Sequence, residues 1–179
     1  MKVVVISGSP RKEAVTQVMM KYVFEYAKSR NPDTKLINLS EGQIECYRGP
    51  AEQYNHATME AARDITEADV WLVGTPIYNS FFSSALKNLF EYINYKKTPG
   101  KVAGMAIMAA GNIGFTDVQT LLTQLMSYFR VVANPKAVYL TTEFVSGDAV
   151  SDPGAQDRLR EMVDETFEMA SKLLPPSHS

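Results

Sequence analysis

The segment at residues 7–11 (Ser-Gly-Ser-Pro-Arg) is the part of the sequence best suited to hold an anion. It follows a short β-branched run at residues 3–6 and precedes a stretch with helical periodicity, so it is predicted to link a strand to a helix. The N–H groups and the dipole of a helix N-terminus favour an anion. The hydroxyl groups of Ser7, Ser9 and Thr16 and the guanidinium of Arg11 add phosphate-binding groups. The alternative is an ordinary strand–helix turn that uses Ser and Gly for capping and Pro for stiffness.

Two further apolar runs end in loops rich in turn-forming residues. Residues 70–73 lead into residues 75–80 (Thr-Pro-Ile-Tyr-Asn-Ser), and residues 102–109 lead into residues 110–114 (Ala-Gly-Asn-Ile-Gly). Continuous apolar runs are typical of strands that are buried on both faces. The loops offer backbone N–H and C=O groups and the ring of Tyr78, which suit a flat heteroaromatic group hydrogen-bonded at its edge. Flavin mononucleotide (FMN) has both parts that these loops suit, a phosphate and a flat heteroaromatic ring, and is therefore a candidate ligand.

The reactive side chains of the sequence suggest no protein-centred chemistry. We find no pattern typical of an acid–base pair or a nucleophile triad, as expected where a cofactor carries the chemistry. The single Cys46 excludes an intrachain disulfide and any all-cysteine metal or iron–sulfur site within one chain. His56 and His178 are far apart in sequence, so we expect no metal site. Tyr47 and Tyr54, in a stretch without periodicity, are candidates either to stack on a flat ligand or to anchor their own loop.

The remaining patterns predict the elements that position these loops. Apolar residues at three- and four-residue steps predict helices, and short apolar or β-branched runs predict strands. The predicted helices cover residues 14–29, 57–67, 82–93, 118–129 and 155–173, and the predicted strands cover residues 3–6, 36–39, 70–73, 102–109 and 137–140. We expect a loop over residues 141–155. Small residues in the 102–109 strand predict that covering helices approach it closely.

Strand and helix alternate five times, which predicts an α/β fold with a doubly wound five-stranded parallel sheet. With strand order 2-1-3-4-5 and helices on both faces, strands one, three and four are adjacent. Ligands bind outside the carboxyl ends of such strands, so we expect the three loops to form one site at one edge of the sheet. The chain is predicted to be a single domain over residues 1–174 with a short tail over residues 175–179.

Composition excludes several classes of function. At 179 residues the chain is long enough for one well-buried core. Its formal net charge of -2 gives no electrostatic footprint for nucleic acid or for an anionic membrane. The sequence contains neither a signal pattern nor an apolar stretch of membrane-spanning length, so we expect a cytoplasmic protein.

Motifs at the three loops carry a family resemblance. They are Gly-Ser-Pro-Arg at residues 8–11, Thr-Pro-Ile-Tyr-Asn at residues 75–79 with Ser-Ala-Leu-Lys-Asn at residues 84–88, and Ala-Gly-Asn at residues 110–112. In order and spacing, residues 1–145 resemble the NADPH-dependent FMN reductase family. The resemblance implies a flavodoxin-like fold and relatives that include flavin, quinone, azo-dye and chromate reductases.

The resemblance also implies which residues hold the cofactor. The FMN phosphate would be bound by Ser9 and Arg11, with Thr16, Gln17 and Val18 closing around it. The isoalloxazine ring and the ribityl chain would be held by Pro76, Ile77, Tyr78 and Asn79. The pyrimidine edge of the ring would be met by Gly111 and Asn112. Lys87 would lie just inside the following helix, where it has either a role in the site or a solvent-exposed pairing with Glu91. Glu13 departs from the family pattern, and an inward-facing acid there would repel a phosphate.

The implied activity is hydride transfer from NADPH or NADH to FMN, followed by reduction of a flavin, quinone or similar acceptor. A flavodoxin-type electron carrier without its own NAD(P)H activity is the alternative, although carriers of that type tend to be strongly acidic. A relative that has lost its flavin is a third hypothesis. Phe81, Phe82, Tyr92 and Tyr95 surround an already apolar helix, so we also expect a homo-oligomer, either a dimer or a tetramer.

Overall fold

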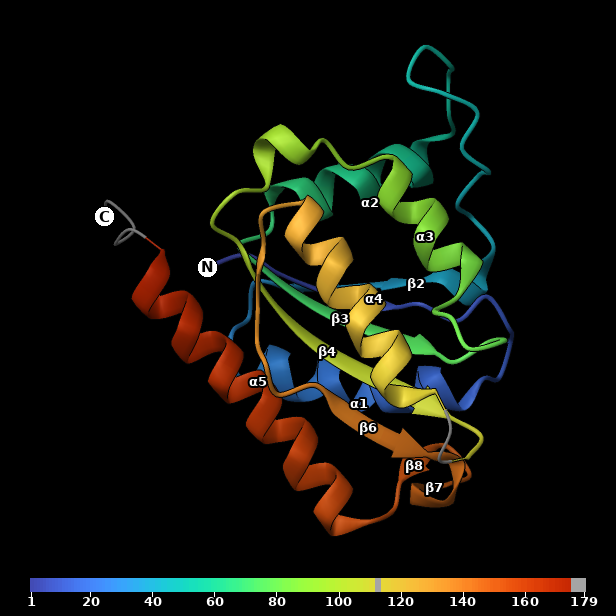
Figure 1. The fold of residues 1–179 in the computed structure, drawn as a ribbon, viewed down its shortest axis with the longest axis vertical. Coiled ribbons are helices and arrows are strands. Elements are labelled where there is room, and N and C mark those ends of the chain that lie inside the picture. Colours follow the sequence, from blue (N-terminus) through green and yellow to red (C-terminus); the bar gives the residue numbers. More distant parts are fainter. Residues whose placement is uncertain (112–113, 175–179) are drawn as a thin grey trace.

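The chain folds around one parallel sheet (Figure 1). The structure is a computed structural model and describes residues 1–111 and 114–174. The predicted tail at residues 175–179 lies outside the described residues. The strands are β1 (Val3–Ser7), β2 (Thr34–Asn38), β3 (Val70–Pro76), β4 (Val102–Ala109), β5 (Val132–Ala133) and β6 (Val138–Thr141). They follow the order β2-β1-β3-β4-β5, with β6 also pairing with β4, which confirms the predicted topology.

Helices cover both faces of the sheet. On one face lie α1 (Val15–Arg30) and α5 (Pro153–Leu173), and on the other lie α2 (His56–Glu67), α3 (Ser84–Glu91) and α4 (Phe115–Tyr128) (Figure 1). Side chains alternate along a strand, so Val3 and Val5 of β1 pack with α1 and α5, whereas Val4 and Ile6 pack with the other three helices. The doubly wound arrangement expected from the alternating elements is therefore present.

The fifth strand position is interrupted at Pro135. β5 pairs with the start of β4 and β6 with its end, and Pro135 lies between them. Proline has no N–H group to donate to a sheet ladder, so the strand breaks there. Asn134 spans the break, because its backbone N–H donates to Ala103 O at 2.7 Å and its side-chain amide donates to Thr166 Oγ1 at 3.1 Å.

The expectation of a loop over residues 141–155 is wrong. This segment holds a short 3-10 turn (Thr142–Phe144) and a hairpin of β7 (Val145–Ser146) and β8 (Ala149–Val150). The hairpin turns at Gly147, whose φ of 60° favours glycine, followed by Asp148. A Gly-Asp pair is a known hairpin signal, but strands of two residues are too short to show an alternating pattern.

The long connection between β2 and α2 extends away from the body of the protein (Figure 1). Tyr47 and Tyr54 stack with ring centroids 6.1 Å apart, and both meet the ring of Tyr92 edge-on. Asn88 of α3 binds the same loop, since it accepts from Tyr47 N at 2.8 Å and donates to Glu45 O at 2.7 Å. The two loop tyrosines therefore anchor their own segment.

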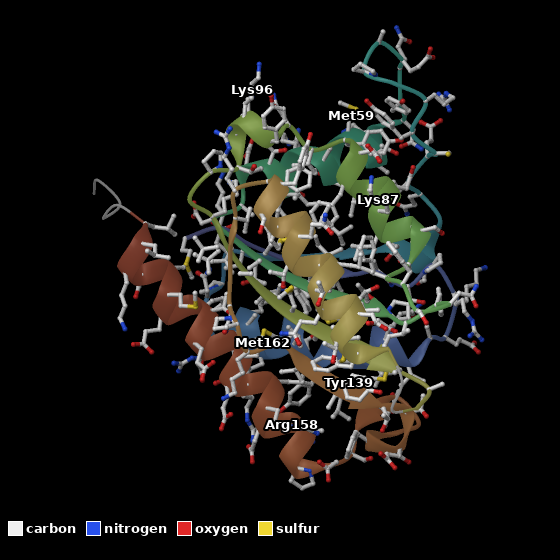
Figure 2. The ribbon with its side chains drawn as sticks, in the orientation of Figure 1. Met59, Lys87, Lys96, Tyr139, Arg158 and Met162 are labelled. Atoms are coloured by element: carbon white, nitrogen blue, oxygen red, sulfur yellow. The ribbon has the colours of Figure 1, made fainter. Side chains whose placement is uncertain are left out.

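Small residues in the central strands let the helices of one face approach closely. A Cβ atom added to Gly104 would lie 2.5 Å from Met162 Sδ and 2.7 Å from Thr166 Oγ1 of α5. Met162 is labelled in Figure 2 where α5 crosses the sheet. A Cβ atom added to Gly74 would likewise overlap the Met20 side chain of α1. The close approach predicted from the composition of β4 is confirmed.

We predict that Gly104→Ala lowers the free energy of unfolding by about 1–3 kcal/mol, because α5 must move away from β4. Urea denaturation of the purified protein measures this loss. Gly154→Ala is the matched control, since Gly154 is exposed in the first turn of α5 and an added methyl group there approaches only Asp152. Equal stability of Gly104→Ala and the parent protein would contradict the packing argument.

Candidate active site

The carboxyl ends of β1, β3 and β4 bring the predicted loops together at one edge of the sheet. Gly8 N donates to Gly74 O at 2.8 Å, and Ile77 N donates to Met108 O at 2.9 Å. A Cβ atom added to Gly8 would lie 2.5 Å from Gly74 O, so only glycine permits this approach without a shift of the backbone. The first two loops are thus held against each other and against β4.

Ser83 fastens the first loop to the second. Its Oγ accepts from Leu86 N at 3.0 Å, as the N-cap of α3, and donates to Gly8 O. Its own N–H donates to Thr75 Oγ1 at 3.2 Å. Ser83 is fully buried, and its role was not predicted from the sequence. The available signal was a Ser preceding an amphipathic helix, which is typical of an N-cap.

Ser9 and Tyr78 form a second link between the two loops. The Ser9 Oγ and the Tyr78 hydroxyl lie 3.1 Å apart, and Arg11 N donates to the Ser9 Oγ at 3.3 Å. Ser9 is fully buried. The hydroxyl groups of Ser9 and Tyr78 therefore fix the path of the first loop from within, while the Arg11 side chain remains exposed.

The loops border an open cavity of about 940 Å³, near the upper end of the usual range for small-molecule sites. Four residues assigned by resemblance line it, namely Arg11, Ile77, Tyr78 and Asn79, together with Phe81, Phe82, Ser84 and Lys87. Positive φ angles of 49° at Asn79 and 63° at Ser80 turn the second loop sharply at this wall. Phe81 and Phe82, expected to surround the helix predicted over residues 82–93, both line the cavity ahead of α3, which begins at Ser84.

The charge of the cavity suits an anion. Two of the lining side chains are cationic, Arg11 and Lys87, and none of the described lining residues is acidic. No ion pair in the described part of the chain uses the Arg11 guanidinium. Ile77, Phe81 and Phe82 offer apolar surface beside these cations. A phosphate ester that carries a flat ring system fits this combination, so the residues present fit FMN.

The other residues assigned by resemblance occupy different positions. Thr16 is buried at the start of α1, and Pro76 is buried at the end of β3. Gln17 donates through Nε2 to Arg11 O at 2.6 Å, and this hydrogen bond links α1 to the first loop. Gln17 and Val18 both line a second cavity of about 350 Å³, bounded by α1, β2 and the β7–β8 turn.

The third loop is described only in part, because Asn112 and Ile113 lie outside the described residues. Gly111 O accepts a hydrogen bond from the Tyr139 hydroxyl of β6. Burial, with a smaller contribution from Glu143, raises the pKa of Tyr139, so the hydroxyl keeps the proton that it donates. A Cβ atom on Gly114 would contact Ile77 at 3.4 Å, which places the end of this loop against the second loop.

Glu13 does not line the main cavity. The backbone of Glu13 has a φ of 55°, and the residue lies along the second cavity together with Ala14 and Lys21. The Glu13 side chain therefore lies outside the cavity that Arg11 lines.

Residues 1–145 match the family described as NADPH-dependent FMN reductase. The chain belongs to this family. It is accordingly an oxidoreductase of the FMN- and NAD(P)H-dependent type. Among the described residues, no group of three or more His, Cys, Asp and Glu side chains is arranged to hold a metal ion. None of the helices in the described residues is long and apolar enough to cross a membrane.

Relatives of similar length carry related names. The chain is 28% identical over 173 residues to an NAD(P)H-dependent FAD/FMN reductase of Geobacillus thermodenitrificans, covering 94% of this chain and 93% of the relative. It is 29% identical over 143 residues to an NADPH azoreductase of a Bacillus species, covering 78% of this chain and 76% of the relative. Among solved structures, the flavoenzyme FerB of Paracoccus denitrificans, an NAD(P)H:(acceptor) oxidoreductase, superposes with a TM-score of 0.76 at 23% sequence identity. The superposition covers 96% of this chain and 98% of FerB. This likeness shows the fold.

We predict that Ser83→Ala costs about 1–2 kcal/mol of unfolding free energy, because α3 loses its N-cap, and also weakens FMN binding, because Gly8 O loses its donor. Urea denaturation and quenching of FMN fluorescence measure the two effects. Asn55→Ala is the matched control, since Asn55 caps α2 by accepting from Thr58 N at 2.8 Å, away from the cavity. A Ser83→Ala variant that loses stability but keeps its FMN affinity would contradict the bridging role.

Proposed function

We propose that the main cavity binds FMN and that the enzyme passes electrons from NAD(P)H through this cofactor to a small-molecule acceptor such as a flavin or a quinone. The observation that supports this most directly is the combination of an Arg11 guanidinium that forms no ion pair with the described residues and apolar side chains along one cavity at the carboxyl edge of the sheet. Family membership supports the same activity. The electron-carrier alternative has no comparable support, because the named relatives are reductases.

In this proposal the first loop binds the phosphate of FMN. The Arg11 guanidinium would pair with it, while Gln17 and Ser9 hold the loop in place. Bound FMN supplies the capacity to accept a hydride from NAD(P)H and to pass its two electrons on. Among the described residues of the cavity wall there is no Asp, Glu, His or Cys, so the protein contributes binding and orientation.

The second loop would hold the ring system. Ile77 presents an apolar side chain, and Tyr78 is oriented by its contact with Ser9. Phe81 and Phe82, whose ring centroids lie 5.0 Å apart, form an apolar wall ahead of α3. These side chains exclude water from one side of a bound ring. The backbone of Gly111, held by Tyr139, would meet the pyrimidine edge from the third loop, as would Asn112, which lies outside the described residues.

We further propose that the protein is a homo-oligomer assembled through α3 and α4, and that it works in the cytoplasm, where NAD(P)H is supplied. A groove of about 330 Å³ runs between these helices and is lined by Lys87, Phe90, Glu91, Ile93, Leu125, Tyr128 and Phe129. Tyr128 at its border is 63% exposed and Tyr95 beside it 38%, with ring centroids 5.7 Å apart. Of the four aromatic residues expected on the surface, Phe81 and Tyr95 are exposed, whereas Phe82 is buried and Tyr92 is partly buried.

We predict that Arg11→Met weakens FMN binding by about 10- to 100-fold, the equivalent of one charge-assisted hydrogen bond. Equilibrium titration with FMN, followed by fluorescence, gives the dissociation constant. The control is Arg63→Met on α2, which removes an exposed arginine that pairs with Glu60. An unchanged dissociation constant for Arg11→Met would reject the assignment of the phosphate to the first loop.

For the oligomer, we predict that Tyr128→Glu lowers the mass in solution to that of one chain, because a charge is placed in an apolar interface. Sedimentation velocity at micromolar concentration measures the mass. Met59→Glu, at a position on α2 that is 52% exposed, serves as the control (Figure 2). A parent protein that is itself monomeric would refute the proposed assembly.

A further inference from the structure

Lys87 is the second cation of the main cavity, and it comes from a different element than the first. Arg11 belongs to the loop after β1, whereas Lys87 lies on α3 (Figure 2). Lys87 also lines the neighbouring groove between α3 and α4, so it stands at the junction of the two depressions. The cavity therefore offers two positive charges on separate walls.

Within one chain, the described contacts leave Lys87 available to a ligand from the main cavity, while its side toward the α3–α4 groove would face the partner copy of the proposed oligomer. Its Nζ pairs with Glu91 one turn further along α3, and the two side chains are 49% and 42% exposed. An exposed pair of this kind contributes little to stability, because solvent screens the charges and two long side chains lose freedom. An incoming phosphate would therefore exchange with Glu91 at small cost. None of the described residues lining the main cavity presents an acidic group that would compete for Lys87 there.

FMN accounts for only one of the two cations. It carries a single phosphate, which the proposed function assigns to Arg11 and the first loop. NADH brings a pyrophosphate, and NADPH brings an additional phosphate on the 2′-hydroxyl of its adenosine. Phe81, 48% exposed on the wall of the same cavity, presents an apolar ring to any flat group placed next to Lys87. Lysine is a suitable point charge for a phosphate that approaches from solvent.

We propose that Lys87 binds a phosphate group of the pyridine dinucleotide. This inference rests on the proposed function, because it requires that NAD(P)H and FMN meet in the main cavity. It assigns Lys87 to recognition of the electron donor and Arg11 to retention of the cofactor. The sequence left open whether Lys87 has a role in the site or only pairs with Glu91 at the surface. The structure shows the pairing with Glu91, and we propose the role in the site in addition.

The test compares Lys87→Met and Lys87→Arg with the parent protein loaded with FMN. The matched control is Lys172→Met, which breaks an equivalent exposed pair with Glu168 near the end of α5, on the opposite face of the sheet. Direct binding of NADP⁺, NAD⁺ and adenosine 2′,5′-bisphosphate is measured by calorimetry, and KM and kcat are measured with NADPH and with NADH.

We expect Lys87→Met to weaken NADP⁺ binding at least 10-fold and to raise the KM for NADPH by a similar factor, while kcat and the FMN dissociation constant change little. Lys87→Arg should restore most of the affinity, because it keeps the charge. If the 2′-phosphate is the partner, adenosine 2′,5′-bisphosphate weakens as NADP⁺ does and NAD⁺ is unaffected. If the pyrophosphate is the partner, NADP⁺ and NAD⁺ weaken alike.

Two results would overturn the inference. One is a Lys87→Met protein that binds NADP⁺ and NAD⁺ as tightly as Lys172→Met does. The other is a loss of affinity in Lys87→Met that is accompanied by an equal loss for FMN, which would indicate a general disturbance of the cavity. Failure of the proposed function is seen separately, because the parent protein would then fail to bind FMN or to oxidise either nucleotide.

Discussion

The site depends on the close approach of two backbone segments, the turn after β1 and the end of β3. Gly8 lies so near Gly74 O that a side chain would collide with it, and the hydrogen bond between these two residues exists because the side chain is missing. Ser83 then donates to Gly8 O while it caps α3. One pair of glycines and one serine thus set the relative position of the first loop, the second loop and α3. The walls that carry Arg11, Tyr78 and Lys87 are oriented by these contacts.

The chemistry of the cavity follows from what these elements carry. The described lining consists of cations, aromatic rings, an aliphatic side chain and small polar groups. Such a wall suits an anionic, flat molecule, and in our proposal the protein binds and orients the flavin that performs the electron transfer. Two cations on separate walls further suit a reaction in which two phosphorylated molecules meet. The family match and the geometry therefore support the same activity by independent routes.

Much of this arrangement follows from the sequence, because the buried strands are continuous apolar runs and parallel strands in a doubly wound sheet end at one edge. The meeting of residues 8–11 with residues 75–79 was predicted on that basis. The role of Ser83 was not, because its acceptor, Gly8 O, lies 75 residues away and carries no side-chain signal. The position of Val18 along the second cavity depends on the rotation of α1, which periodicity alone does not fix. The β7–β8 hairpin escaped prediction because two-residue strands show no period.

Whether NADPH reduces FMN bound to this protein can be observed in an anaerobic visible spectrum of the FMN-loaded protein, recorded before and after addition of NADPH. We expect that FMN binds and that its absorbance in the visible bleaches promptly when NADPH is added. Bound flavin that stays oxidised with both NADPH and NADH would contradict the account and favour an electron carrier. Failure to bind FMN would mean that the three loops serve a different ligand.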